Sequence, residues 1–159
     1  MKLTITSTTG EFVTLCECKE YLKVNDESRD DLIMRCAKMA TTFVEHAINE
    51  SLCNHDVKFV TNLDFVHSLY LYPVGVINSV KDVVTGEDVA YTTDIDKECV
   101  ILGSNAVVQI IYTTVPSTES NEAAKMATLA LTSLIYDGVT DRAEWNAVVT
   151  NYLADKLPL

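Results

Sequence analysis

Hydrophobic positions follow the period of an α-helix in the first and last parts of the chain and the period of a β-strand between them. In the first part, an apolar stripe runs from Leu32 to Leu52 at helical spacing, which predicts one long helix. From Val57 to Val115 the period changes to two, with many β-branched and aromatic residues, which predicts short strands. The expected helices span about residues 14–23, 28–53, 118–137 and 141–156, and the expected β region spans about residues 57–115.

These elements predict an α+β fold, a helical bundle of about four helices with a small antiparallel β-sheet or meander inserted between the second and third. A length of 159 residues suits a single domain, residues 1–159, with one modest core. The opening residues Met1–Ser7 alternate in a strand-like way and lack the long apolar run of a signal peptide. A soluble protein that is cytoplasmic at first is therefore expected.

Several helix boundaries are marked by residues that satisfy free backbone groups. Thr14 followed by Glu17 has the spacing of a capping box, and Asp141 followed by Glu144 resembles a second one. Gly138 fits the position just after a helix C-terminus.

Turn residues divide the β region. Thr85–Gly86 predicts a hairpin turn, and Gly103–Ser104–Asn105 predicts a second turn. Pro73 lacks a backbone N–H and predicts an edge position or a break in the strand.

Apolar residues in the last part of the chain exceed what one small core obviously needs. The third helix is apolar over most of its surface, a stripe runs from Trp145 to Leu153, and Leu157–Pro158–Leu159 follows it. Exposed patches of this kind mark partner surfaces. The alternative, that all of them pack inside one domain, stays open on the pattern alone.

The formal net charge of −11 comes from 12 basic and 23 acidic residues. This balance argues against tight binding of nucleic acid, which needs clustered Lys and Arg. It is compatible with a protein that DNA slides past, because an acidic wall repels phosphates. Simple solubility explains the same charge.

Candidate metal ligands have simpler explanations. Cys16-x-Cys18 and Cys53-x-His55 could supply four ligands, but residues two apart on a helix point about 200° apart, and zinc sites normally use a longer cysteine spacing. Asp94-x-Asp96-x-Glu98 resembles half of a calcium loop but lacks its turn glycine. We expect small hydrophobic thiols and a solvated acidic turn, with no metal and no cofactor.

Catalytic motifs are also missing from the sequence. There is no glycine-rich phosphate loop, nucleophile elbow or paired-histidine zinc helix. His46 beside Glu45 would need a nucleophile such as Cys36 or Cys99, and no spacing demands one. We therefore expect no catalytic residues and no enzymatic activity.

Ordered motifs resemble a known family. Val13–Val24 is similar to the opening V-T-L-x-E-x-K-x-x-L-(K/R)-V of tailed-bacteriophage head–tail connector (adaptor, head-completion) proteins, and Asp30–Ile33 to the start of their long second helix. Pro73–Lys81 resembles the family's P-V-x-x-I-x-S-V-x segment, and Val108–Thr113 its V-x-I-x-Y strand. The match covers about residues 13–137, with Val115–Pro116 standing where the family has glycine and tyrosine.

The resemblance implies a homo-oligomeric ring, commonly of twelve subunits, in the virion neck between capsid and tail, reached from the host cytoplasm during assembly. Its partners would be further copies of itself, the portal protein and a stopper or tail-completion protein. Genomic DNA would pass through its channel without specific binding, and no membrane would be involved. Another head-completion or tail-completion protein, such as a stopper, is the alternative, and a small cytoplasmic enzyme or metal-binding protein is a more remote one.

Residues with expected roles fall into three groups. The C-terminal segment, which the resemblance places on the portal, comprises Tyr152, Leu153, Leu157, Pro158 and Leu159. Candidate contacts between subunits are Trp145, Val148, Val149, Leu129 and Met126. Candidate channel-facing residues are Glu119 and Glu122.

Overall fold

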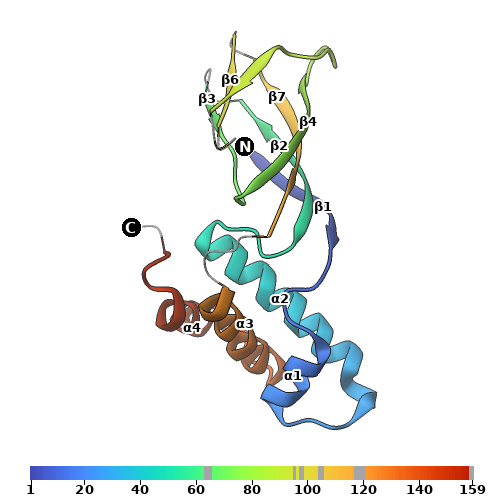
Figure 1. Ribbon diagram of the computed structural model, residues 1–159, viewed down its shortest axis with the longest axis vertical. Coiled ribbons are helices and arrows are strands. Elements are labelled where there is room, and N and C mark those ends of the chain that lie inside the picture. The colour runs from blue at the N-terminus through green and yellow to red at the C-terminus, as the bar shows by residue number, and fades with distance from the viewer. Residues whose placement is uncertain (63–65, 95, 97–98, 104–105, 117–120, 158–159) are drawn as a thin grey trace. The chain divides into compact units, whose positions relative to one another are not determined.

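The chain folds into two compact units, each with its own core. A computed structural model describes residues 1–62, 66–94, 96, 99–103, 106–116 and 121–157 (Figure 1). The helical unit comprises Glu11–Ile48 and Thr118–Leu159, and the β unit comprises Met1–Gly10 and Asn49–Ser117. The helix-period and strand-period segments each bury an apolar face of their own, and the single domain expected from the sequence stays a prediction.

The elements confirm the predicted α+β class, with antiparallel strands between the second and third α-helices. None of the helices in the described ranges is long and apolar enough to cross a membrane. In chain order the elements are β1 (Lys2–Thr9), α1 (Leu15–Leu22), the 3₁₀ turn η1 (Glu27–Arg29), α2 (Asp30–Ile48), β2 (Asn54–Thr61), β3 (Val66–Ser68), β4 (Val74–Asp82), β5 (Tyr91–Thr93), β6 (Cys99–Leu102), β7 (Val108–Thr114), α3 (Asn121–Tyr136) and α4 (Arg142–Leu153).

The first helix, α1, begins at the predicted capping box. The Thr14 hydroxyl accepts a hydrogen bond from the Glu17 N–H (3.2 Å), and a Glu17 carboxylate oxygen accepts one from the Thr14 N–H (2.9 Å). Two N–H groups that would otherwise lack partners are thus satisfied. The helix ends at Lys23, which adopts a left-handed conformation with φ 56°.

The long helix α2 carries the predicted apolar stripe but ends earlier than expected, at Ile48. Asn49 is left-handed with φ 55°, and its side-chain oxygen accepts a hydrogen bond from the Leu71 N–H (3.0 Å). The left-handed backbone of Asn49 ends the helix, and its side chain binds the distant Leu71 instead of continuing the helical turn. The buried Leu52 and Cys53, which continue the apolar pattern, belong to the β unit instead.

The end of α3 and the start of α4 also agree with the sequence, whereas α4 ends at Leu153, earlier than the expected residue 156. Gly138 has φ 86° and follows α3, and the Val139 N–H donates to the Leu134 carbonyl (3.0 Å), as in a glycine-terminated helix. Asp141 caps α4 by accepting a hydrogen bond from the Ala143 N–H (2.9 Å). In the helical unit α3 packs against both α2 and α4. One buried cluster of this unit contains Val13, Cys18, Ile33, Ala37 and Leu129.

The β unit contains two antiparallel sheets. The larger has the strand order β1-β2-β7-β4, and the smaller has the order β3-β6-β5. The order differs from a simple meander, because the last strand, β7, inserts between β2 and β4. The strand-like N-terminus is confirmed as β1, which pairs with β2 at the edge of the larger sheet.

Alternate residues of β2 and β7 build the core of the β unit. Every second side chain of β7 is buried, and Ile110 pairs with Phe59 on β2 and with Val80 on β4. The hydroxyl of the buried Tyr112 donates a hydrogen bond to the Tyr70 carbonyl, and burial raises the pKa of Tyr112. Period-two burial of this kind fixes the strand register, since a one-residue slip would expose the whole set.

A tight turn follows β4, as the sequence predicts. Gly86 has φ 74°, and its N–H donates to the Asp82 carbonyl (2.9 Å). The Asp82 carboxylate accepts further hydrogen bonds from the N–H groups of Val84 (2.7 Å) and Thr85 (3.0 Å). Pro73 lies just before β4, in agreement with the expected break. The second predicted turn includes residues 104 and 105, which lie outside the described residues.

The two faces of β7 predict a contrast between neighbouring isoleucines. Ile110 is fully buried and Ile111, on the opposite face, is half-buried. We expect Ile110→Ala to lower the free energy of unfolding of the β unit by about 2–5 kcal/mol, because it leaves a cavity, and Ile111→Ala to cost less than half as much. Hydrogen exchange of the β7 amides in increasing urea measures this, while the single tryptophan, Trp145, reports on the helical unit. Equal losses for the two variants would contradict the assigned faces.

Candidate interaction surfaces

Four of the residues predicted to contact a neighbouring subunit or the portal lie in the core of the helical unit. Trp145 is 7% exposed, Val149 1%, Leu153 0% and Leu129 7%. The helical spacing of these apolar residues suggested a partner surface, but packing within a single chain explains the same spacing. These four side chains therefore contribute to the core, and Trp145 also lines the groove described below. Their predicted contacts with a partner stay predictions.

The other candidates remain accessible. Met126 and Tyr152 are 39% and 40% exposed, and Val148 and Leu157 are half-buried. Glu122 is exposed in the first turn of α3. Their predicted contacts stay predictions. Three further candidates, Glu119, Pro158 and Leu159, lie outside the described residues.

Tyr152 belongs to an exposed tyrosine pair. Tyr21 on α1 is 38% exposed, and burial together with the neighbouring Tyr152 raises the pKa of Tyr21. Tyrosine combines a large apolar ring with a polar hydroxyl and is enriched in protein interfaces. The pair therefore extends the accessible end of α4 towards α1.

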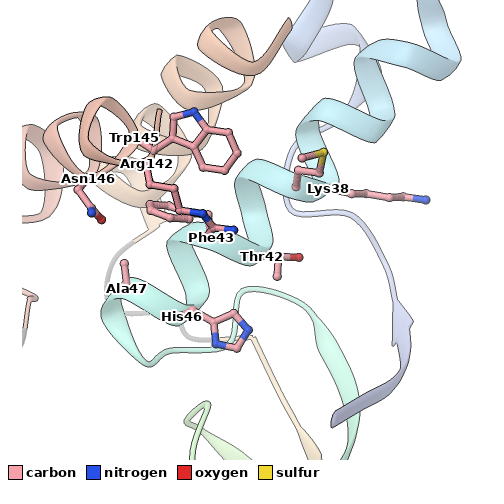
Figure 2. Close-up of a pocket in the computed structure, with 9 residues that line it drawn as sticks. Lys38, Thr42, Phe43, His46, Ala47, Arg142, Trp145 and Asn146 are labelled. Carbon is pink, nitrogen blue, oxygen red and sulfur yellow. The ribbon is translucent and has the colours of Figure 1, made fainter. Parts of the chain in front are cut away.

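A groove lies between α2 and α4. It has a volume of about 760 Å³ and is open to solvent. Figure 2 shows that Phe43 of α2 and Arg142 and Trp145 of α4 gather between the two helices. The lining residues are Lys38, Met39, Thr42, Phe43, His46, Ala47, Arg142, Trp145 and Asn146.

Aromatic and cationic contacts organise the floor of this groove. The rings of Phe43 and Trp145 meet edge to face with their centroids 5.3 Å apart. The Arg142 guanidinium lies 5.8 Å from the Phe43 ring centre and 5.6 Å from that of Trp145. The Trp145 indole N–H donates to the Val139 carbonyl (3.0 Å), which fixes the ring. Arg142 is thus held by cation–π contacts while its charge stays at the surface.

The groove is basic on a strongly acidic chain. Lys38 and Arg142 are both exposed, and no Asp or Glu lines the groove within the described part of the chain. Met39, which is 52% exposed, adds an apolar wall. This arrangement suits a segment that carries carboxylates beside apolar side chains.

Sequence reasoning missed the groove. Phe43 and Trp145 were assigned to apolar stripes, and nothing in a helical period shows that two stripes meet beneath an arginine. The spacing of Arg142 and Trp145, three residues apart on one helix, was the available signal, because residues at that spacing are neighbours on a helix surface.

The cysteine candidates for a metal site are separated by their environments. On α1, Cys16 is exposed and Cys18 is buried, which confirms that the two thiols face different sides of the helix. Burial raises the pKa of Cys18 to about 11. In the β unit, the His55 ring lies 2.9 Å from the Thr8 hydroxyl. No group of three or more metal-ligating side chains occurs among the residues that the structure describes.

Two further sets of polar residues were candidates, the acidic turn for calcium and His46 with Glu45 for catalysis. The Asp94 carboxylate accepts a hydrogen bond from the Cys99 N–H (3.0 Å), which ties the acidic turn to β6. Glu98 of the same turn lies outside the described residues. Of the other pair of candidates, Glu45 is buried and His46 is exposed, so the two neighbours occupy opposite environments on α2.

Comparison with known proteins identifies one family. The family model described as "Phage gp6-like head-tail connector protein" matches residues 12–99, which is more than half of the chain. This range begins just before α1 and ends at the first residue of β6. None of the curated protein sequences compared with the chain matches it.

Solved structures share the fold across nearly the whole chain. A chain of "Neck of empty GTA particle computed with C6 symmetry" aligns with a TM-score of 0.68 and 13% identity, over 96% of this chain and 95% of that one. A chain of "Virion of native gene transfer agent (GTA) particle" gives 0.65 and 13%, over 96% and 95%. A chain of "Neck of native GTA particle computed with C12 symmetry" gives 0.64 and 14%, over 96% and 94%. At these identities the likeness shows the fold alone.

The environments of the two α1 cysteines predict different reactivities. The thiolate is the nucleophile, and the raised pKa of about 11 keeps the buried Cys18 protonated at pH 8. We therefore expect iodoacetamide at pH 8 to modify Cys16 at least tenfold faster than Cys18 in the folded protein, as followed by peptide mass spectrometry. In urea the two rates should converge. Equal rates in the folded protein would show that α1 does not bury Cys18.

Proposed function

The chain belongs to the phage gp6-like head–tail connector family, and from this premise we propose that it is a structural protein of the virion neck, forming a ring between the portal and the stopper or tail. The observation that carries the proposal is the family match over residues 12–99. The family is a class of structural virion proteins, and its function is assembly instead of catalysis.

The proposed ring contains twelve copies. Support comes from the similar fold found in necks computed with C12 and with C6 symmetry, since a twelvefold ring also satisfies sixfold symmetry. Closed rings use heterologous contacts, in which one face of a subunit meets a different face of the next. Burial of apolar area at about 25 cal/mol per Å² would drive their formation.

The proposed portal contact uses the accessible end of the chain. Tyr152 and Leu157 offer exposed and half-buried apolar surface after the buried Leu153. Leu153 anchors this end of α4 in the core, so a partner can contact the exposed Tyr152 beside it without unfolding the helical unit. Pro158 and Leu159 continue the same segment in the sequence.

The net charge of −11 supports a wall along which DNA passes without adhering. Carboxylates repel phosphates, and a ring repeats each carboxylate in every copy. Glu122, exposed at the start of α3, and Glu119 just before it in sequence are the proposed channel-facing residues.

A direct binding experiment distinguishes this function from that of a stopper. A connector should bind purified portal by itself, whereas a stopper should bind only after the connector is in place. Electron microscopy of the chain mixed with portal should therefore show an added ring. Absence of binding to portal alone, with binding to a portal already occupied by another connector, would contradict the proposal.

Two tyrosines of nearly equal exposure provide a matched test of the portal contact. Tyr152 is 40% exposed on α4 and Tyr91 is 38% exposed on β5. We expect Tyr152→Ala to weaken binding to portal at least tenfold, because aromatic side chains often dominate interface energies, and Tyr91→Ala to leave it unchanged. Biolayer interferometry on immobilised portal measures both. A larger loss with Tyr91→Ala would move the portal contact to the β unit.

A further inference from the structure

The hairpin turn after β4 presents an apolar tip among carboxylates. Val84 is 85% exposed, more than any other large hydrophobic side chain in the described ranges, and the adjacent Val83 is 49% exposed. Asp82, Glu87 and Asp88 surround these valines in the sequence, with Lys81 as the one nearby cation. The Lys81–Asp88 pair is 3.9 Å apart and exposed, so it neutralises little.

This tip is held in one conformation. The Asp82 carboxylate accepts hydrogen bonds from the Val84 and Thr85 N–H groups, and the Asp82 N–H donates to the Glu87 carbonyl (2.9 Å). A rigid turn loses little entropy when it binds a partner. An exposed pair of valines on such a turn has no role in the core of its own unit and is available to another surface.

The groove between α2 and α4 offers the complementary chemistry. Lys38 and Arg142 supply two positive charges, and Phe43, Met39 and Trp145 supply apolar and aromatic surface. Asp141, next to Arg142, caps α4 through the Ala143 N–H and does not line the groove. Glu144 is exposed and does not line the groove.

We propose that the acidic hairpin tip, residues 82–88, of one copy docks in the α2–α4 groove of the next copy. Val83 and Val84 would pack on Phe43 and Met39, and the tip carboxylates would face Lys38 and Arg142. Copies with a net charge of −11 repel one another at long range. A contact between copies therefore needs a local match of opposite charge, and the groove supplies it.

The contact joins two different faces, one on the β unit and one on the helical unit. Such a head-to-tail arrangement propagates from copy to copy and closes when the rotation fits. The inference rests on the proposed ring and names the surfaces that would form it.

Paired variants test the contact on the portal-bound ring. Val83→Ser with Val84→Ser, and separately Lys38→Glu with Arg142→Glu, should each lower the cooperativity of ring filling and the number of copies bound per portal at least twofold, as counted by native mass spectrometry. Val76→Ser is the matched control, since Val76 is 57% exposed on β4 away from the turn. Combining Lys38→Glu and Arg142→Glu with Glu87→Lys and Asp88→Lys should restore filling.

Cross-linking shows whether the contact is between copies. A heavy-isotope chain with Val84→Cys is mixed with a light chain with Thr42→Cys, and a short bis-maleimide joins thiols that lie close together. A heavy–light peptide linking positions 84 and 42 supports the proposal. In a second experiment, heavy and light versions of a chain that carries both substitutions are mixed. If every link between positions 84 and 42 then joins two peptides of the same isotope label, docking occurs within a single copy and the proposal is overturned.

The outcomes separate this inference from the proposed function. If wild-type rings form on the portal and neither variant pair alters filling, the groove contact is wrong and the neck function stands. If the wild-type chain does not bind portal, the proposed function fails, and cross-linking between copies in concentrated solution still decides the contact. Loss of the helical far-UV circular dichroism signal in the Lys38→Glu, Arg142→Glu variant would mark misfolding, and the result for the exposed valine pair would then decide the contact.

Discussion

Burial of one face of α2 is the interaction on which the helical unit depends. Ile33, Ala37, Ala40 and Val44 are each no more than 2% exposed, and α3 packs against this helix. Small residues in the stripe let the two helices approach closely, and the other face of α2 is then left to solvent with Lys38 and Met39. The buried face of α2 packs on α3, and its exposed face, with Lys38 and Met39, forms one side of the groove with α4.

Local signals in the sequence predicted helix starts, turns and strand period well. Thr14 with Glu17, Asp141, Gly138 and the turn at Gly86 all act through atoms within a few residues, so their geometry follows from the residue types alone. The placement of β7 between β2 and β4 could not be predicted in this way. It depends on pairing between strands about fifty residues apart, as in the pair Phe59 and Ile110. The period of two in a strand's sequence shows that it is a strand but does not show which strand it pairs with.

Prediction of the interaction surfaces was weaker, for a related reason. A helical stripe such as Trp145, Val149 and Leu153 shows that one face is apolar but does not show what covers it. Here α2 and α3 cover it, whereas Tyr152, one residue before Leu153, remains 40% exposed. The family resemblance was correct because it rests on ordered motifs along the chain, and the order of elements is conserved by the fold even at 13% identity.

The position of β7 also constrains how the chain emerges from the ribosome. β7 lies inside the larger sheet and ends at Thr114, so the sheet that joins β1, β2 and β4 cannot form until Thr114 has been made. Likewise α2 waits for α3, which ends at Tyr136. Neither unit can be completed by the N-terminal half, and a nascent chain stalled there would expose apolar strand edges that invite aggregation. The β unit therefore needs synthesis to at least Thr114, and the helical unit needs synthesis to at least Tyr136, before either can fold.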